Sequence, residues 1–223
     1  MIIVALDVET AAEARAIVSS LGDSASFYKV GLELYASAGM DFVRELKSQG
    51  NRVFLDLKLY DIPETVRRAV VQIARSGVDF LTVHGMRQVM RAAVAGRADT
   101  DLKLLAVTVL TSVDDADLAC DGYSKTVAEL VAWRAQNAKE DGVDGLICSP
   151  LDVRTVRSIA GPEMILVTPG VRSAGTAAAD QKRVATPAEA VSNGADYLVI
   201  GRQITRAADP RAEMSRILGE LTR

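Results

Sequence analysis

Eight short apolar segments, each followed by a helical pattern, constrain the fold of this chain more than any other feature. The predicted strands are residues 2–7, 26–30, 53–58, 79–84, 103–110, 144–148, 164–168 and 196–200. Several are apolar at successive positions, which is typical of parallel strands covered on both faces. Regular alternation of strand and helix over 223 residues predicts an α/β fold, a single (β/α)8 TIM barrel forming one domain over residues 1–223.

Helix signals and a weak internal repeat support this prediction. Capping boxes are predicted at Thr10-x-x-Glu13, Thr126-x-x-Glu129 and Thr186-x-x-Glu189, and Asp209-Pro210 is expected to start the last helix. A Gly-Val/Ala-Asp-x-Leu unit recurs at residues 77, 142 and 194, where the glycine suits a left-handed helix end. An open doubly wound sheet is the alternative, but no G-x-G-x-x-G follows the first strand. Residues 112–125 match no element and are expected to form a surface excursion.

Charge and hydropathy narrow the classes of partner. The net charge of −3 gives no basic surface for nucleic acid. The sequence has no stretch of about 20 apolar residues and no signal-peptide pattern, so we expect no membrane partner and a cytoplasmic protein. An anionic ligand would need a local cationic site. The two cysteines, Cys120 and Cys148, lack metal-type spacing and are expected to be reduced.

Charged residues gather where the predicted strands end. Asp7 follows the first strand, Lys29 lies in the second, and Asp56 and Lys58 lie in the third. The carboxyl ends of barrel strands build active sites, and residues two apart on a strand share a face. Charges in so apolar a strand are costly unless they are paired, and Asp61 could complete a neutral group with Lys29, Asp56 and Lys58. A surface ion pair at a frayed strand end is the plainer interpretation.

Residues 56–65, DLKLYDIPET, resemble the D-x-K-x-x-D-I-x-x-T signature of orotidine 5'-monophosphate decarboxylases. The resemblance continues through the opening ALD, Lys29-Val-Gly, residues 107–112, residues 168–172, Asp180-Gln181 and residues 199–202, in the family's order. It covers essentially the whole chain. The combination is specific, whereas D-x-K-x-x-D alone is shared by a wider superfamily.

The resemblance implies conversion of orotidine 5'-monophosphate to UMP and CO2, the last step of de novo pyrimidine nucleotide synthesis, without cofactor or metal. Loss of CO2 from C6 leaves electrons that cannot delocalise into the ring, so a fixed cation and prompt protonation are required. Lys58 suits both tasks. The resemblance makes Lys58, Asp56, Asp61 and Lys29 the catalytic group, with Asp56 near the substrate carboxylate and Asp7 and Lys29 at the ribose hydroxyls.

The remaining predicted contacts involve the phosphate, the base and a second subunit. Barrels often bind phosphate after strands seven and eight, which points to Gly201 and Arg202. Arg172 and Gln181 lie in residues 170–186, a stretch expected to close over the ligand, and Thr111 matches a base contact. By resemblance, Asp61, Ile62 and Thr65 are supplied by the neighbouring subunit, which implies a homodimer with shared active sites.

Two rival functions stay open. A metal-dependent sugar-phosphate decarboxylase or aldolase of the same superfamily would share D-x-K-x-x-D, but it would carry a carboxylate where this chain has Lys29. A non-catalytic barrel that binds phosphorylated metabolites is possible because fold alone does not fix function. The completeness of the motif argues against it. His84, the single histidine, is expected to be an ordinary hydrogen-bonded residue at the rim.

Overall fold

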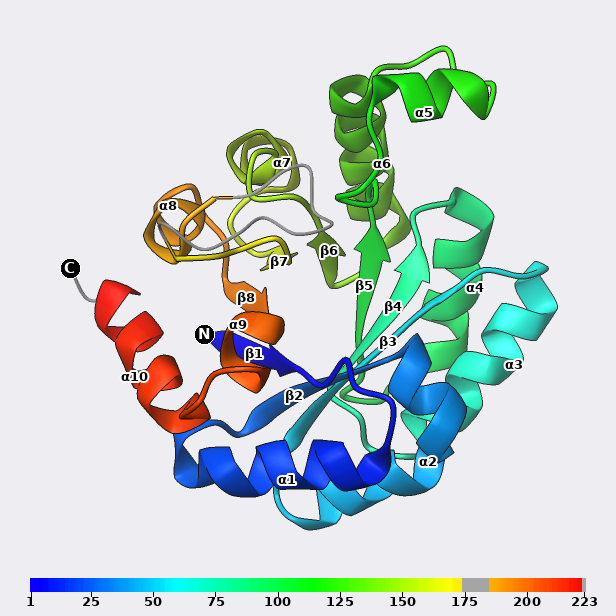
Figure 1. Cartoon of the computed structure of the whole chain (residues 1–223). Helices are drawn as coiled ribbons and strands as arrows, with labels where there is room; N and C mark the ends of the chain where they lie inside the picture. Colours follow the sequence, from blue (N-terminus) through cyan, green and yellow to red (C-terminus); the bar gives the residue numbers. More distant parts are fainter. Residues whose placement is uncertain (174–184, 222–223) are drawn as a thin grey trace.

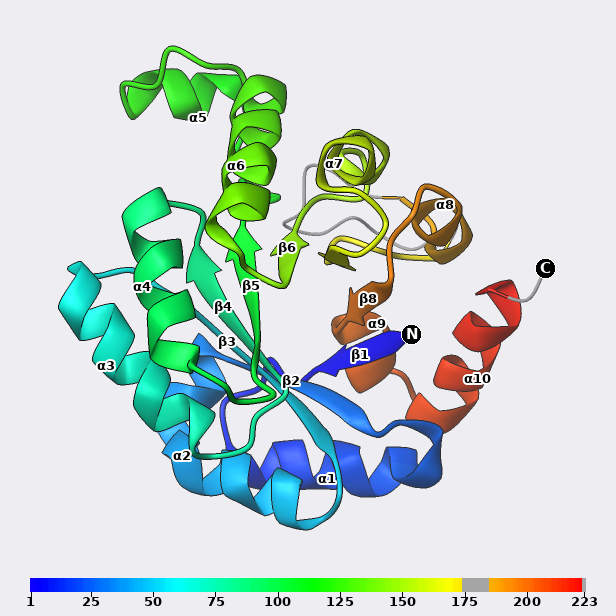
Figure 2. The same cartoon turned by 180° about the vertical axis from the view of Figure 1, so that it is seen from behind.

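The strands form one closed parallel barrel in the computed structural model, which describes residues 1–173 and 185–221 (Figures 1 and 2). Each strand pairs with its neighbours in sequence, and β8 pairs with β1 to close the barrel. The strands are β1 Ile2–Ala5, β2 Phe27–Gly31, β3 Arg52–Leu59, β4 Phe80–His84, β5 Lys103–Val107, β6 Gly145–Ile147, β7 Ile165–Thr168 and β8 Tyr197–Ile200. The predicted (β/α)8 barrel is therefore confirmed, with every predicted strand in place.

Helices surround the barrel on its outer side (Figure 1). They are α1 Ala11–Leu21, α2 Leu32–Ser48, α3 Pro63–Ala74, α4 Arg87–Arg97, α6 Val127–Asp141, α7 Val153–Ala160, α8 Pro187–Ser192 and α10 Pro210–Leu221, with the 3-10 turn η1 Gly22–Ser24. Two short helices were not predicted, α5 Asp115–Cys120 and α9 Arg202–Thr205. Within the described residues, no helix is both long and apolar enough to span a bilayer.

The two unpredicted helices lie at the carboxyl-end side of the barrel. Helix α5 occupies the stretch expected to form a surface excursion, and it lies at the outer end of α6 in both views (Figures 1 and 2). A reciprocal capping box between Asp114 and Asp117 starts it and supplies partners for backbone N–H groups in the first turn of this six-residue helix. Helix α9 begins directly after β8 and Gly201.

The predicted helix punctuation is largely confirmed. Capping boxes start α6 and α8, whereas only the Thr10 half of the box is present at α1. The repeated glycines Gly77, Gly142 and Gly194 all have positive φ. The repeated aspartates Asp79, Asp144 and Asp196 accept hydrogen bonds from the backbone N–H groups of Val53, Leu104 and Leu166 at 2.8–2.9 Å. The repeat thus links the start of each strand to the strand before it.

Aromatic packing closes the amino-terminal end of the barrel. Phe27 and Phe80, the first residues of β2 and β4, meet edge to face with ring centroids 5.1 Å apart. The Arg52 guanidinium lies 4.1 Å from the Phe27 ring centroid and also covers Phe80 and Tyr197. Cation–π contacts and burial of the arginine stem stabilise this end. The opposite, carboxyl end is left to form a site.

Candidate active site

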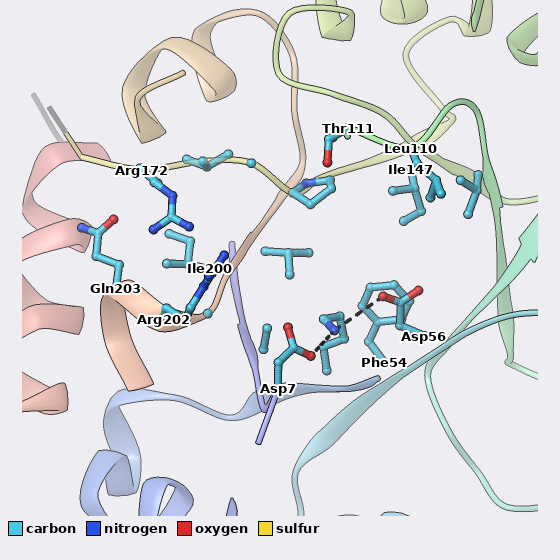
Figure 3. Close-up of a pocket in the computed structure, with 18 of the residues that line it drawn as sticks. Asp7, Phe54, Asp56, Leu110, Thr111, Ile147, Arg172, Ile200, Arg202 and Gln203 are labelled. Atoms are coloured by element: carbon cyan, nitrogen blue, oxygen red, sulfur yellow. Dashed lines mark hydrogen bonds and ion pairs between the residues drawn. The ribbon is translucent and has the colours of Figure 1, made fainter. Parts of the chain in front are cut away.

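A cavity of about 450 Å³ opens at the carboxyl ends of the strands (Figure 3). It is lined by residues at or just after β1, β2, β3, β5, β6, β7 and β8. The predicted site residues that line it are Asp7, Lys29, Asp56, Lys58, Thr111, Arg172, Gly201 and Arg202. Residues from segments far apart in the sequence therefore meet in one pocket.

Four charged side chains form a continuous ion-pair network on one side of the pocket. Lys29 Nζ lies 2.7 Å from Asp7 Oδ1 and 3.5 Å from Asp56 Oδ2. Lys58 Nζ lies 2.9 Å from Asp56 Oδ1. Two lysines and two carboxylates alternate, so the group is neutral overall. Asp7, not Asp61, supplies the second negative charge within this chain.

Burial and charge compete at the centre of this network, around Lys29 and Asp56. Burial alone would raise the pKa of Asp56, but Lys29, Lys58 and hydrogen bonds from Lys58 and Thr82 hold it below its usual value. Burial alone would lower the pKa of Lys29, but Asp56 and Asp7 raise it above its usual value. Both side chains are therefore charged at neutral pH, which fixes an anion between two ammonium groups.

The backbone at Lys58 departs from the regular strand on which the sequence argument relied. Leu55 pairs with Leu81 and Leu59 with Val83, so residues 56–58 of β3 lie opposite Thr82 alone. Lys58 has φ +48°, and its N–H donates to Thr82 Oγ1 at 2.9 Å instead of to a carbonyl of the ladder. The prediction that Asp56 and Lys58 lie on one face through regular strand alternation is therefore wrong in its reason. A β-bulge brings the two side chains together.

Two arginines face this network across the pocket. Figure 3 shows Arg172, Arg202 and Gln203 at one side and Asp56 at the other. Arg172 follows β7, and its backbone N–H donates to the Ala185 carbonyl at 3.0 Å. Gly201 places its backbone against Ala5, where an added Cβ would lie 3.3 Å from the Ala5 Cβ. An anionic group could therefore sit between cationic side chains and closely packed backbone.

A polar network fixes the chain beside Arg172 to the last helix. The Ser173 hydroxyl donates to Glu220 at 2.9 Å and accepts from Gln203 at 2.8 Å and Arg216 at 3.0 Å. Glu213 also accepts from Gln203 and Arg216, and the Arg216 hydrogen bond is the main cause that lowers the pKa of Glu213 to about 2. Gln203 lines the pocket and was missed by the sequence argument, which had no pattern to single it out.

Several predicted residues do not line the pocket of the single chain. Asp61, Ile62 and Thr65 are exposed, and the Asp61 carboxylate accepts from the Ile62 N–H at 2.6 Å. Gln181 lies outside the described residues.

His84 is half-buried beside Tyr60, and their ring centroids lie 5.2 Å apart. Burial is the main cause that lowers the pKa of His84, followed by the charges of Arg134 and Lys58. Within the residues that the structure describes, no cluster of three or more His, Cys, Asp or Glu could hold a metal.

Fold and pocket together define a (β/α)8-barrel protein with a lysine–carboxylate site at the carboxyl end of its strands. The chain belongs to the orotidine 5'-phosphate decarboxylase / HUMPS family, whose model matches residues 1–217. This membership confirms the resemblance drawn from residues 56–65 and the other motifs.

Relatives and solved structures agree with that family assignment. A protein of Bradyrhizobium sp. strain ORS 278 named orotidine 5'-phosphate decarboxylase is 54% identical over 220 residues, covering 99% of this chain and 90% of its own length. A protein of the same name from Caulobacter sp. strain K31 is 51% identical, covering 99% of this chain and 96% of its own. The crystal structure of orotidine 5'-phosphate decarboxylase from Lactobacillus acidophilus matches with a TM-score of 0.88 and 39% identity, over 100% of this chain and 99% of that one.

Proposed function

We propose that this protein decarboxylates orotidine 5'-monophosphate to UMP and CO2, the last step of de novo pyrimidine nucleotide synthesis. Family membership supports the reaction, and one observation supports its chemistry most directly. Lys58 presents an ammonium group to the pocket, 2.9 Å from a carboxylate that is itself held between two lysines.

Lys58 is assigned the central step. The bond between C6 and the carboxylate carbon breaks, its electron pair stays on C6, and CO2 leaves. The Lys58 ammonium stabilises that pair and then donates a proton to C6, which gives UMP. Opposite charges about 4 Å apart attract by about 4 kcal/mol at an effective dielectric near 20, so this contact supplies part of the barrier reduction. Binding of the non-reacting parts of the substrate supplies the rest.

Asp56 and Lys29 are assigned to hold that cation in place. Asp56 would lie near the substrate carboxylate, where it opposes the negative charge of the ground state and holds Lys58 in position. Lys29 would keep Asp56 ionised and, with Asp7, contact the ribose hydroxyls. The short Lys29–Asp7 and Lys58–Asp56 distances support this division.

The arginine side of the pocket is assigned to the phosphate. Arg202, Gly201 and Arg172 would bind it, which separates the phosphate from the reacting carbon by the width of the pocket (Figure 3). Thr111 would contact the base, and Gln181 is proposed to join from residues 170–186. No cofactor or metal is part of the proposal.

A homodimer with shared sites completes the proposal, and Asp61, Ile62 and Thr65 would enter the partner's site. Two apolar side chains on the loop after β3, Tyr60 and Ile62, are 61% and 66% exposed, which suits a surface that a second copy covers.

Mixing two inactive variants tests directly whether the two subunits share their active sites. Lys58→Ala and Asp61→Ala dimers, each inactive alone, should regain activity after subunit exchange, because one site of each hybrid is intact. Absence of any recovery in confirmed hybrids contradicts shared sites.

The reaction itself is tested by following the ultraviolet absorbance of orotidine 5'-monophosphate with purified, metal-stripped protein. We expect full turnover after exhaustive EDTA treatment and no gain on adding Mg²⁺. Strict Mg²⁺ dependence would favour the metal-dependent superfamily branch. Binding of UMP without turnover would favour a non-catalytic barrel. The protein is further proposed to act in the cytoplasm, with neither nucleic acid nor membrane as partner.

A further inference from the structure

A fully buried threonine on β4 links the two residues at the centre of the proposed mechanism. The Thr82 hydroxyl donates to Asp56 Oδ1 at 2.8 Å and accepts from the Lys58 backbone N–H at 2.9 Å. Lys58 Nζ donates to the same Asp56 oxygen at 2.9 Å. Three hydrogen bonds thus close a ring through one hydroxyl, one carboxylate oxygen and one lysine.

The bulge in β3 makes the Lys58 backbone depend on this hydroxyl. Three residues of β3 lie opposite Thr82, so the Lys58 N–H has left the regular strand ladder. This part-buried N–H needs another acceptor, and the Thr82 oxygen provides it. Lys58 also holds φ +48°, a conformation that residues with a side chain rarely adopt and keep only where their surroundings impose it.

The direction of each hydrogen bond in the ring is fixed. Because a backbone N–H can only donate, the Thr82 oxygen accepts from Lys58, and its single proton is left for Asp56. Asp56 Oδ1 therefore faces Thr82 and Lys58, while Oδ2 faces Lys29 at 3.5 Å. The hydroxyl sets which carboxylate oxygen each lysine meets.

We propose that Thr82 is a positioning residue for decarboxylation, which holds the Lys58 ammonium and the Asp56 carboxylate in their reactive arrangement without touching the substrate. This inference rests on the proposed function. Thr82 does not line the pocket. It therefore acts on the reacting carbon only through Lys58 and Asp56.

Thr82→Val, a nearly isosteric change, removes the hydroxyl and both of its hydrogen bonds. We expect kcat for orotidine 5'-monophosphate to fall about 10- to 100-fold, as for loss of a hydrogen bond to a charged group, with KM and UMP affinity changed by less than about threefold. Thr82→Ser keeps the hydroxyl and should recover most of the lost kcat. Thr82→Ala replaces the valine variant if that protein does not fold.

Thr108→Val is the matched control. Thr108 is also a fully buried threonine, directly after β5, and its hydroxyl donates to the Ile147 carbonyl at 2.8 Å and not to a member of the charged network. Its loss should lower stability while leaving kcat within about twofold of wild type, since a neutral backbone bond is removed. The Thr82 hydrogen bond helps to lower the pKa of Asp56, so the acid limb of the kcat–pH profile should move to higher pH in Thr82→Val. It should stay in place in Thr108→Val.

The possible outcomes separate this inference from the proposed function. If the wild-type protein does not decarboxylate orotidine 5'-monophosphate, the proposed function fails. If the wild type is active, a kcat for Thr82→Val within about threefold of wild type overturns the role of Thr82. Equal losses in Thr82→Ser and Thr82→Val also overturn it, because packing and not the hydroxyl would then be responsible.

Discussion

Replacing Asp56 by asparagine should destabilise the protein in a pH-dependent way. The amide keeps the shape of the side chain but removes the negative charge that lies 2.9 Å from Lys58 Nζ and 3.5 Å from Lys29 Nζ. Asp56 is 9% exposed and Lys29 8%, so solvent compensates poorly for the loss. Two ammonium groups would then face a neutral side chain.

The size of the effect follows from these distances. At an effective dielectric near 20, each ion pair is worth about 5 kcal/mol before the cost of desolvation. Lys29 retains Asp7 at 2.7 Å, and the Lys58 side chain is 29% exposed and can turn toward water. We therefore expect a net loss of about 3 kcal/mol in the free energy of unfolding at pH 7, the low end for breaking a buried pair.

The sign of the pH dependence follows from the shifted pKa values. The pKa of Asp56 in the folded protein is below the usual 3.8, so its stabilisation is complete above that value and lost as pH falls through the folded pKa. The pKa of Lys29 is above the usual 10.5, so its contribution is complete below that value and lost only at higher pH. The free energy of unfolding of the wild type should therefore exceed that of Asp56→Asn by a constant amount around neutral pH. The difference should be smaller in strong acid.

Urea unfolding measures this difference in the free energy of unfolding. The protein concentration is kept fixed, because association of the subunits would shift the apparent stability. Asp7→Asn is the control: its carboxylate also contacts Lys29 but is 51% exposed, so its loss should cost less than about 1 kcal/mol. A loss below about 1 kcal/mol for Asp56→Asn at pH 7, or one that does not shrink in acid, would refute the reasoning.

Two further predictions concern opposite ends of the barrel. Arg52→Ala removes the guanidinium that covers Phe27, Phe80 and Tyr197, and thermal unfolding should show a loss of about 1–2 kcal/mol with kcat unchanged. A drop in kcat would show that the two ends are coupled. Arg202→Ala should lower kcat/KM for orotidine 5'-monophosphate by about 10- to 100-fold while leaving kcat/KM for phosphate-free orotidine unchanged. Equal losses for both substrates would place Arg202 elsewhere than at the phosphate.

The barrel could be predicted because its strands and helices follow strong local rules. Apolar runs, capping threonines and the repeated Gly-x-Asp unit each act within a few residues, and the structure confirms the strands they predict. The positions of Asp7, Lys29, Asp56 and Lys58 followed from the fold, because parallel strands bring their carboxyl ends together.

The parts that could not be predicted depend on contacts between distant segments. The bulge at Lys58 is set by pairing of β3 with β4, and an apolar strand sequence gives no sign of it. In the sequence, Thr82 is an ordinary β-branched strand residue. Only the bulge places the Lys58 N–H within hydrogen-bond distance of its hydroxyl. Gln203 gains its role from Ser173 and Glu213. Helix α5 is the exception, because its Asp114–Asp117 capping box spans three residues and is a local pattern.

The most direct test of the account compares Lys58→Ala with the wild-type protein, both metal-stripped, for loss of orotidine 5'-monophosphate and for UMP affinity. We predict that the variant folds and binds UMP about as tightly as the wild type but forms no detectable UMP from the substrate. Turnover at the wild-type rate in Lys58→Ala would contradict the account, because the proposed reaction would then proceed without its ammonium group.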